Sequence, residues 1–228
     1  MKLLAVETAT EGCSAALAID GEIFTRFEIV PRRHAELILP MCESLLAEAG
    51  IKLSHLDAIA FGRGPGSFTG VRIAAGITQG LAFGLDLPVV PVSTLAALAQ
   101  EIMTELGKTN VLAAIDARMG EIYWGCYRRD EQGSARLIGA ERVSKAGDVT
   151  VPADHTWYGA GSGWSVYGDT LAQRSVSLFE CHDADRLPRA EYIARLAEIA
   201  FAQGLAVSAE QAQPVYLRDD VAKKSHAL

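Results

Sequence analysis

The stretch Gly62-Arg63-Gly64-Pro65-Gly66-Ser67-Phe68-Thr69-Gly70-Val71-Arg72 closes the apolar run 57–62 and leads into a glycine-rich segment that continues to residue 85. A short apolar run bounded by glycine and proline is typical of a buried strand. Ser67 is a residue type that caps helices, because its side-chain oxygen accepts a free backbone N–H of the first turn. The stretch therefore predicts a strand over 57–62, a tight loop, and a helix over 68–85.

Two phosphate-loop interpretations of this loop fail on its residues. A Walker A loop needs Lys followed by Ser or Thr after its last glycine, and no lysine occurs between Lys52 and Lys108. A dinucleotide fingerprint needs G-x-G-x-x-G after the first strand, whereas Gly64, Gly66 and Gly70 have another spacing and follow a later strand. What remains is the general ability of a helix N-terminus to bind an anion.

The predicted helix carries a row of glycines on one face. Gly76, Gly80 and Gly84 are four residues apart, and Arg72 heads the same row. Each interior glycine destabilises a helix by about 1 kcal/mol relative to alanine. The presence of several glycines in one row therefore indicates a role that compensates for this cost. A face without side chains lets another backbone approach closely. The residues alone leave two explanations open: packing against this chain's own elements, or an interface with another subunit.

The sequence pattern of the first half of the chain predicts an α/β lobe. The Asp20-Gly21 pair is typical of a type I′ hairpin turn, in which both central residues have positive φ. The apolar stripe within 34–49 predicts an amphipathic helix, and Gly50 suits its C-terminal end. The expected strands are 2–7, 13–19, 22–29, 57–62 and 88–92, and the expected helices are 34–49, 68–85 and a helix capped by Ser93 that ends near residue 106.

The second half restarts with strands and predicts a smaller lobe. The expected elements are strands 110–116, 121–127 and 157–162, a helix over 192–203 and a short extended tail at 214–217. A hairpin followed by strand–helix units gives an α/β fold with a mixed sheet. We therefore expect a first lobe over 1–106 and a second, reduced lobe over 107–228, with the last helix and the tail packing back on the first.

Composition excludes several classes of function. Half of the 228 residues are hydrophobic, so we expect the chain to fold around a sizeable core. Its net charge is −7, so we do not expect it to bind nucleic acid well by itself. Its four cysteines form no C-x-x-C pair, which argues against a zinc site or a disulfide framework. The sequence shows neither a signal peptide nor a membrane-spanning run, and we expect a cytoplasmic protein that does not associate with membranes.

Signatures of catalysis are also missing. No two of the five histidines are three or four residues apart, so the chain has no H-x-x-x-H or H-E-x-x-H metal face. No G-x-S-x-G nucleophile elbow occurs. Asp116 and Glu121 could point into one cleft, but acids at strand ends are common. We predict no catalytic residue and no metal ligand in this chain.

Six stretches together match a known family. They are LAVETAT at 4–10, RHAELILP at 33–40, the whole 62–72 segment, PVSTL at 91–95, DARMGEIY at 116–123 and PVYLR at 214–218. The chain resembles the TsaB (YeaZ) family, bacterial proteins of tRNA threonylcarbamoyladenosine biosynthesis. The match is dense over the first 125 residues and thinner beyond. The resemblance implies an actin-like, ribonuclease-H-like fold of two lobes, the first with a mixed five-stranded sheet.

The resemblance also implies a function and a set of partners. Members of this family bind TsaD, a larger paralogue, and TsaE and tRNA join the assembly. TsaD transfers a threonylcarbamoyl group to the adenosine beside the anticodon of tRNAs that read ANN codons. The family implies that this chain binds and activates TsaD and is not itself the transferase. Whether it prefers a heterodimer with TsaD or a homodimer is left open, as are its contacts with TsaE.

The chain departs from the catalytic paralogue at the positions that matter for chemistry. Thr94 and Leu98 stand where the paralogue carries its H-x-x-x-H metal motif, and neither offers an imidazole. The fold's two phosphate loops lack their glycines, and one adenosine-type turn, at 159–162, looks intact. The expected nucleotide site is therefore vestigial, and its residues are Thr8, Thr10, Asp116, Gly159 and Gly161. We expect no firmly bound cofactor, and ATP or ADP stays open at the interface of the complex.

The family places its pairing surface on the helices 34–49 and 68–85, which form a four-helix bundle with the same pair of TsaD or of a second copy. The expected interface residues are His34, Leu37, Ile38, Met41, Leu45, Phe68, Val71, Arg72, Ala75, Gly76, Gln79 and Gly80. Two alternative functions remain to be distinguished. One is an independent ATPase or phosphotransferase on the same fold, and the other is a peptidase acting on TsaD.

Overall fold

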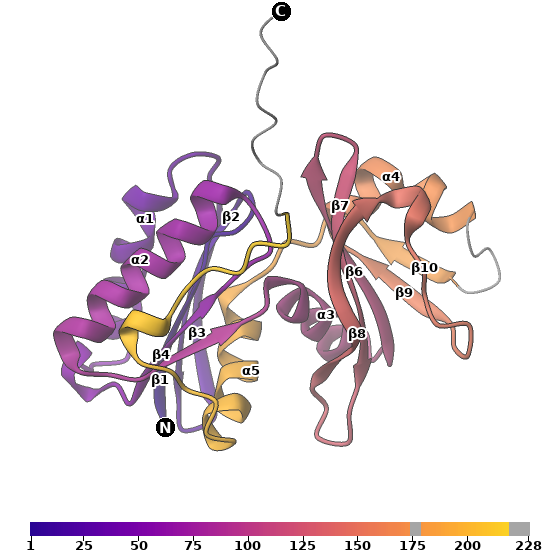
Figure 1. Cartoon of the computed structure of the whole chain (residues 1–228). Coiled ribbons are helices and arrows are strands. Elements are labelled where there is room, and N and C mark those ends of the chain that lie inside the picture. Colours follow the sequence, from indigo (N-terminus) through magenta and orange to yellow (C-terminus); the bar gives the residue numbers. More distant parts are fainter. Residues whose placement is uncertain (174–178, 219–228) are drawn as a thin grey trace, which may run out of the picture.

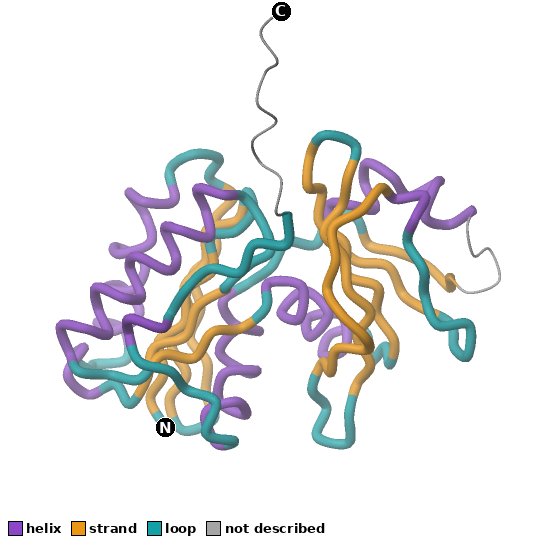
Figure 2. Tube along the Cα trace, in the orientation of Figure 1, coloured by secondary structure: helices purple, strands orange, loops and turns teal. Residues whose placement is uncertain are grey.

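Two α/β lobes face each other, each built on a five-stranded sheet (Figure 1). The computed structural model describes residues 1–173 and 179–218. Within those residues, no helix is both long and apolar enough to cross a bilayer. Helices cover the outer faces of the sheets, and other helices lie between the two sheets (Figure 2).

The first sheet has the order β3-β2-β1-β4-β5. Its strands are β1 (Lys2–Glu7), β2 (Gly12–Ile19), β3 (Glu22–Ile29), β4 (Ala58–Gly62) and β5 (Val89–Val92). The first three pair antiparallel, whereas β1, β4 and β5 pair parallel, so the expected mixed sheet is confirmed. Asp20 and Gly21 have φ of 49° and 96°, as the predicted hairpin turn requires.

Alternation along the strands sends apolar side chains to both faces of this sheet. Leu4 and Val6 face α1 (His34–Glu48) and α2 (Phe68–Leu85), which lie side by side as the outer layer (Figure 1). Leu3 and Ala5 face α5 (Ala190–Ala202), which returns from the second half of the chain. A strand buried on both faces must be apolar at successive positions, which explains the apolar run at the start of the sequence.

The second sheet has the order β10-β9-β6-β7-β8. Its strands are β6 (Asn110–Arg118), β7 (Glu121–Arg129), β8 (Ala135–Lys145), β9 (Trp157–Ala160) and β10 (Phe179–Asp183). Helix α3 (Thr94–Glu105) packs on one face and α4 (Ser162–Gln173) on the other. Short 3₁₀ helices complete the described structure at Leu53–His55, Ala146–Asp148 and Ala209–Gln211.

Sequence reasoning missed β8, β10 and α4, and each has a physical reason. β8 is half exposed and contains Gly139 with φ of 81° beside an irregularity in its pairing with β7, so no clean alternation marks it. β10 is short and mostly exposed. α4 includes glycines and a non-helical Tyr167 with φ of −127°, which hides its period.

Buried polar contacts join the lobes behind the cleft. The irregularity of β8 directs Glu141 into the junction, where its side chain is only 7% exposed. The Glu141 carboxylate accepts hydrogen bonds from Ser93 of the first lobe and from Tyr127 of the second. Arg63 adds an ion pair, with 3.9 Å between Nη2 and Glu141 Oε2. Because buried polar groups are costly when unpaired, these pairings stabilise the contact between the two lobes.

Candidate functional site

The loop before α2 is wedged against the turn between β1 and β2. Ser67 N donates to Ala9 O at 2.7 Å, and Thr8 Oγ1 donates to Gly70 O at 2.8 Å. A Cβ at Gly66 would lie 2.5 Å from Ala9 O, and a Cβ at Gly70 would lie closer still to Thr8 O, separations that real Cβ atoms essentially never show. The early glycines of the segment therefore serve close packing inside the chain. Ser67 caps α2 as predicted, accepting from Gly70 N.

The later glycines of α2 behave differently. A Cβ added to Gly76, Gly80 or Gly84 would meet nothing of the described chain within 4 Å. Gly76 and Gly80 are exposed on the outer side of the helix. Close packing against this chain's own elements is therefore the wrong explanation for this row. The interface explanation remains, and the open space over these glycines is what it requires.

The predicted interface residues fall into three groups. Phe68, Arg72, Gly76 and Gly80 are exposed, and Leu37 and Gln79 are half-buried. The other six are buried within the chain: His34, Ile38, Met41, Leu45, Val71 and Ala75. The buried group follows the apolar stripe of each helix, which turns toward its own sheet. These six support the surface from beneath and offer a partner almost no side-chain area.

Two apolar residues that sequence reasoning did not single out lie on the exposed faces instead. Phe83 on α2 is 75% exposed and Leu39 on α1 is 41% exposed. Both fall off the core stripe of their helices, and that offset is the signal that could have found them. Phe83 lies three residues from Gly80, on the same exposed side of α2 as the glycine row.

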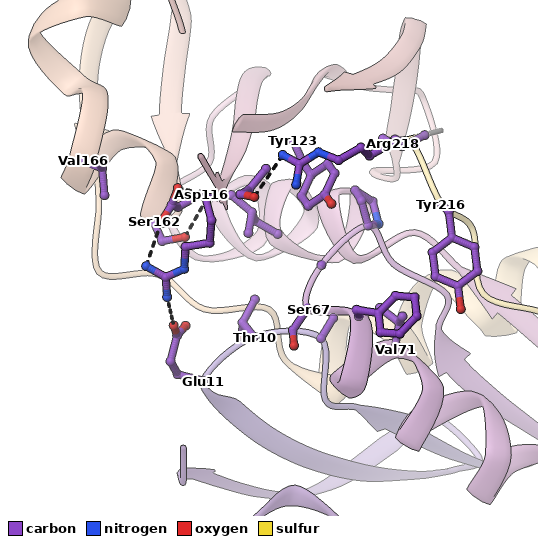
Figure 3. Close-up of a pocket in the computed structure, with 18 of the residues that line it drawn as sticks. Thr10, Glu11, Ser67, Val71, Asp116, Tyr123, Ser162, Val166, Tyr216 and Arg218 are labelled. Carbon is purple, nitrogen blue, oxygen red and sulfur yellow. Dashed lines mark hydrogen bonds and ion pairs between the residues drawn. The ribbon is translucent and has the colours of Figure 1, made fainter. Parts of the chain in front are cut away.

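A cleft of about 840 Å³ opens between the lobes (Figure 3). It is lined by the turn after β1, the start of α2, the end of β6, the start of α4 and the tail that follows Pro214. Its charged groups largely pair with one another. Arg118 spans the cleft, with its Nη1 2.9 Å from Asp116 Oδ2 and its Nη2 3.4 Å from Glu11 Oε1. Ser162 Oγ accepts from Asp116 N at 3.1 Å.

The structure brings together only part of the predicted nucleotide site. Thr10 and Asp116 line the cleft, whereas Thr8 is buried beneath α2. A Cβ at Gly159 would lie closer than 3.0 Å to the indole of Trp164, so this glycine makes room for a core side chain. Gly161 has φ of 99° and packs against Ala114 O. The turn that resembled an adenosine site is occupied by the protein's own packing.

The two acids considered for catalysis are each held by a different arginine. Asp116 pairs with Arg118, and Glu121 Oε2 accepts from Arg218 Nη2 at 2.6 Å. The positions equivalent to the metal motif are internal: Thr94 and Leu98 have no exposed surface. Among residues 1–173 and 179–218, no three His, Cys, Asp or Glu side chains gather in a metal-binding arrangement.

Glu7 is fully buried at the end of β1, beneath Gly62. Its Oε1 accepts from Ala9 N at 2.6 Å and its Oε2 accepts from the Thr94 hydroxyl at 2.9 Å. Burial raises the pKa of Glu7 from 4.5 to about 7, against the lowering effect of these hydrogen bonds. The Glu7 carboxylate is thus sealed inside the first lobe and does not line the cleft.

This raised pKa predicts a pH dependence of stability. Between pH 4.5 and about 7 the folded chain keeps the Glu7 proton that the unfolded chain releases, so stability falls as pH rises through this window. The free energy of unfolding of the wild type should therefore fall between pH 5 and pH 8. In Glu7→Gln we expect this fall to be smaller by up to about 3 kcal/mol, since one pKa unit is worth about 1.4 kcal/mol. Urea unfolding at both pH values measures the difference.

The exposed Glu36→Gln variant is the control and should keep the wild-type pH profile. Glu101, whose pKa burial also raises to about 7, is unchanged in both variants and cancels from the comparison. Identical pH profiles for Glu7→Gln and the wild type would show that Glu7 is ionised in the folded chain at neutral pH.

The tail that follows α5 crosses from one lobe to the other. Val215 N donates to Arg63 O at 2.8 Å beside the glycine loop, and Tyr216 Oη accepts from Arg72 Nε at 2.8 Å. Arg218 then reaches the second lobe, where its Nη2 donates to Ala117 O at 3.1 Å. The sequence predicted an extended tail that packs back on the first lobe, but it did not predict the contact of this tail with α2.

Comparison with known proteins agrees with this architecture. The family model described as "TsaD: tRNA N6-adenosine threonylcarbamoyltransferase" matches residues 27–225. The chain is 46% identical to the Escherichia coli protein named tRNA threonylcarbamoyladenosine biosynthesis protein TsaB, over 98% of this chain and 97% of that protein. The Haemophilus influenzae protein of the same name is 39% identical, over 98% of this chain and 96% of its own length.

A solved structure gives the same result in three dimensions. The structure described as YeaZ from Pseudomonas aeruginosa superposes with a TM-score of 0.89 at 53% identity, covering 95% of this chain and 99% of that one. The expected actin-like fold of two lobes is confirmed. Both by sequence over nearly its whole length and by fold, the chain belongs to the TsaB (YeaZ) family.

Proposed function

We propose that this chain is a non-catalytic subunit of tRNA threonylcarbamoyladenosine biosynthesis that binds TsaD and activates it for threonylcarbamoyl transfer to the adenosine beside the anticodon. TsaE and tRNA join through the complex, in the cytoplasm. The relatives' names support a role in this pathway. The observation that carries the docking role is the glycine row of α2, whose open face has no use within the described chain.

A second helix pair that packs closely against α2 would explain why this face carries glycines. Helices pack at interaxial distances of about 8–10 Å, and the distance falls when the contact residues are small. Gly76 and Gly80 offer such a contact, while Phe83 and Leu39 supply apolar area around it. The matching family model describes the transferase itself, which supports a paralogue with a similar helix pair as the partner.

The geometry of the cleft supports a non-catalytic role. The Asp116 and Glu121 carboxylates are each paired with an arginine, and Trp164 fills the space beside Gly159. An independent ATPase would need phosphate-binding loops and an adenosine pocket, and a peptidase would need a nucleophile–base pair or a metal. The ion pairs and packing described above support neither alternative. ATP or ADP at the interface of the complex stays compatible with this arrangement.

Calorimetry of the purified full-length chain with purified TsaD tests the proposal. We expect a saturable one-to-one complex, no ATP turnover by the isolated chain, and TsaD of unchanged mass after incubation with it. Light scattering of the isolated chain distinguishes a homodimer that dissociates to bind TsaD from a monomer. Absence of a complex would overturn the docking role. ATP turnover that Asp116→Asn abolishes would favour the enzyme alternative.

A further inference from the structure

Arg72, at the head of the glycine row, is held by two aromatic rings. Its Cζ lies 3.5 Å from the ring centroid of Phe68 and 5.6 Å from that of Tyr216. The two rings are 5.8 Å apart and tilted by 40°. The Arg72 Nε also donates to Tyr216 Oη at 2.8 Å. One ring face and one hydrogen bond therefore fix the plane of this guanidinium, although the residue is exposed.

Arg72 has no acidic partner in the part of the chain that the structure describes, and Arg32 shares this property, whereas most other arginines of the first lobe and the cleft are paired. Arg26 pairs with Glu48, and Arg33 pairs with Glu36. Arg118 pairs with Glu11 and Asp116 across the cleft. The Nη1 and Nη2 donors of Arg72 are thus left without a carboxylate among the described residues, while its Nε is used internally.

We propose that the docking partner presents a carboxylate to Arg72, and that Tyr216 of the C-terminal tail is a positioning residue for this contact. The inference rests on the proposed function, because it assumes that the α2 face docks TsaD. Arg72 lies on the same helical row as Gly76 and Gly80, so a helix packed over those glycines brings its flanking side chains to the guanidinium. Two Nη groups in a planar fork match the two oxygens of a carboxylate.

A carboxylate on a protein fits better than an RNA phosphate. RNA binding needs several clustered cations, and the exposed side of the neighbouring helix α1 carries Glu36, Glu43 and Glu48. The chain as a whole has a net charge of −7. Protein interfaces instead draw much of their binding energy from arginine and aromatic residues, and the exposed Phe83 lies on the same helix as Arg72.

Tyr216 of the C-terminal tail orients the Arg72 guanidinium. Arginine loses much rotamer entropy when it is fixed, so a guanidinium held before the partner arrives binds more tightly than a free one. The hold comes from a residue 144 positions away in the sequence. The Val215 N–H bond to Arg63 O fixes the tail beside the glycine loop, which places the Tyr216 ring against α2. Tyr216 thus links the tail to the docking face.

Calorimetric titration of full-length variants with TsaD at low and high salt tests this. We expect Arg72→Glu to weaken binding at least about 100-fold and Arg72→Lys about 10-fold, as for a hot-spot arginine that loses its fork. Tyr216→Phe keeps the ring and removes one hydrogen bond, and should weaken binding about 3-fold. Arg136→Glu makes the same charge change on β8 of the other lobe and should bind like the wild type.

Two further measurements separate positioning from a general structural role. In the Arg72→Ala background, Tyr216→Phe should have no further effect on binding, because the group that it orients is gone. Replacing exposed acids of TsaD by arginine one at a time should identify one variant that restores binding to Arg72→Glu. Circular dichroism checks that each variant keeps the wild-type fold.

The outcomes that overturn the inference differ from those that overturn the proposed function. Wild-type affinity of Arg72→Glu, with binding lost in Gly80→Leu, would leave the docking face in place and remove the carboxylate contact. Wild-type affinity of both variants would remove the docking face itself. If Arg72→Glu binds TsaD normally but the assembled complex loses tRNA, the guanidinium serves a phosphate and the proposed carboxylate is wrong.

Discussion

Gly80→Leu should weaken binding to TsaD at least about 100-fold without disturbing the fold, an effect in the range of a strong interface hot spot. A larger side chain at this position should affect the complex much more than the isolated protein. A Cβ at position 80 meets nothing of the described chain within 4 Å, and the residue is exposed, so we expect a larger side chain there to cost the isolated protein little. The same side chain would fill the space that a partner helix needs for close approach. Calorimetry with TsaD measures the effect, and thermal unfolding checks the fold.

Gly147→Leu is the matched control for this experiment. Gly147 also has open space around its missing Cβ, and it lies in the 3₁₀ helix Ala146–Asp148 of the second lobe, away from α1 and α2. This variant should bind TsaD like the wild type. If Gly80→Leu also binds like the wild type while its fold is intact, the α2 face is not the docking surface.

Two glycines of the same helix should respond to alanine in opposite directions. We expect Gly70→Ala to lower the free energy of unfolding by more than about 3 kcal/mol, because its Cβ would collide with the backbone oxygen of Thr8 and the loop before α2 would have to shift. Gly76→Ala should raise the free energy of unfolding by about 0.5–1 kcal/mol, because it gains helix propensity and meets no obstacle. Urea unfolding with fluorescence detection measures both.

This pair separates a packing role from an interface role without any partner present. A stabilised Gly76→Ala shows that the protein alone derives nothing from this glycine, whose cost then requires an explanation outside the chain. A destabilised Gly76→Ala would mean that the row packs within the chain after all. A neutral Gly70→Ala would mean that the first turn of α2 does not sit against Thr8.

The first lobe could be predicted almost completely from the sequence because its signals are local. The Asp20-Gly21 turn, the apolar runs of β1 and β4, and the Ser67 cap each need only neighbouring residues. In the second lobe these signals are weak. β8 carries an irregular half-exposed pattern around Gly139, and α4 is interrupted at Tyr167, so neither shows a clear period.

The functional surface was harder to predict, because a sequence shows that a helix is amphipathic but not which residues face outward. The family resemblance placed Ile38 and Leu45 at the interface, but both belong to the apolar stripe of α1 that is buried in the lobe's own core. The glycine row directed attention to α2, since four-residue spacing is visible in sequence, and the docking role of that helix stays a prediction. The contact between Tyr216 and Arg72 joins distant parts of the chain, and no local sequence pattern predicts it.

Reconstituted tRNA modification tests the central claim most directly. Purified TsaD, TsaE, the enzyme that forms the threonylcarbamoyl adenylate, ATP and unmodified tRNA are combined with and without the full-length chain, and threonylcarbamoyladenosine is quantified by mass spectrometry of the digested tRNA. A required non-catalytic subunit predicts product with the chain, loss of product without it, and the same loss when Gly80→Leu replaces the wild type. Undiminished product in the absence of the chain would contradict the proposed function.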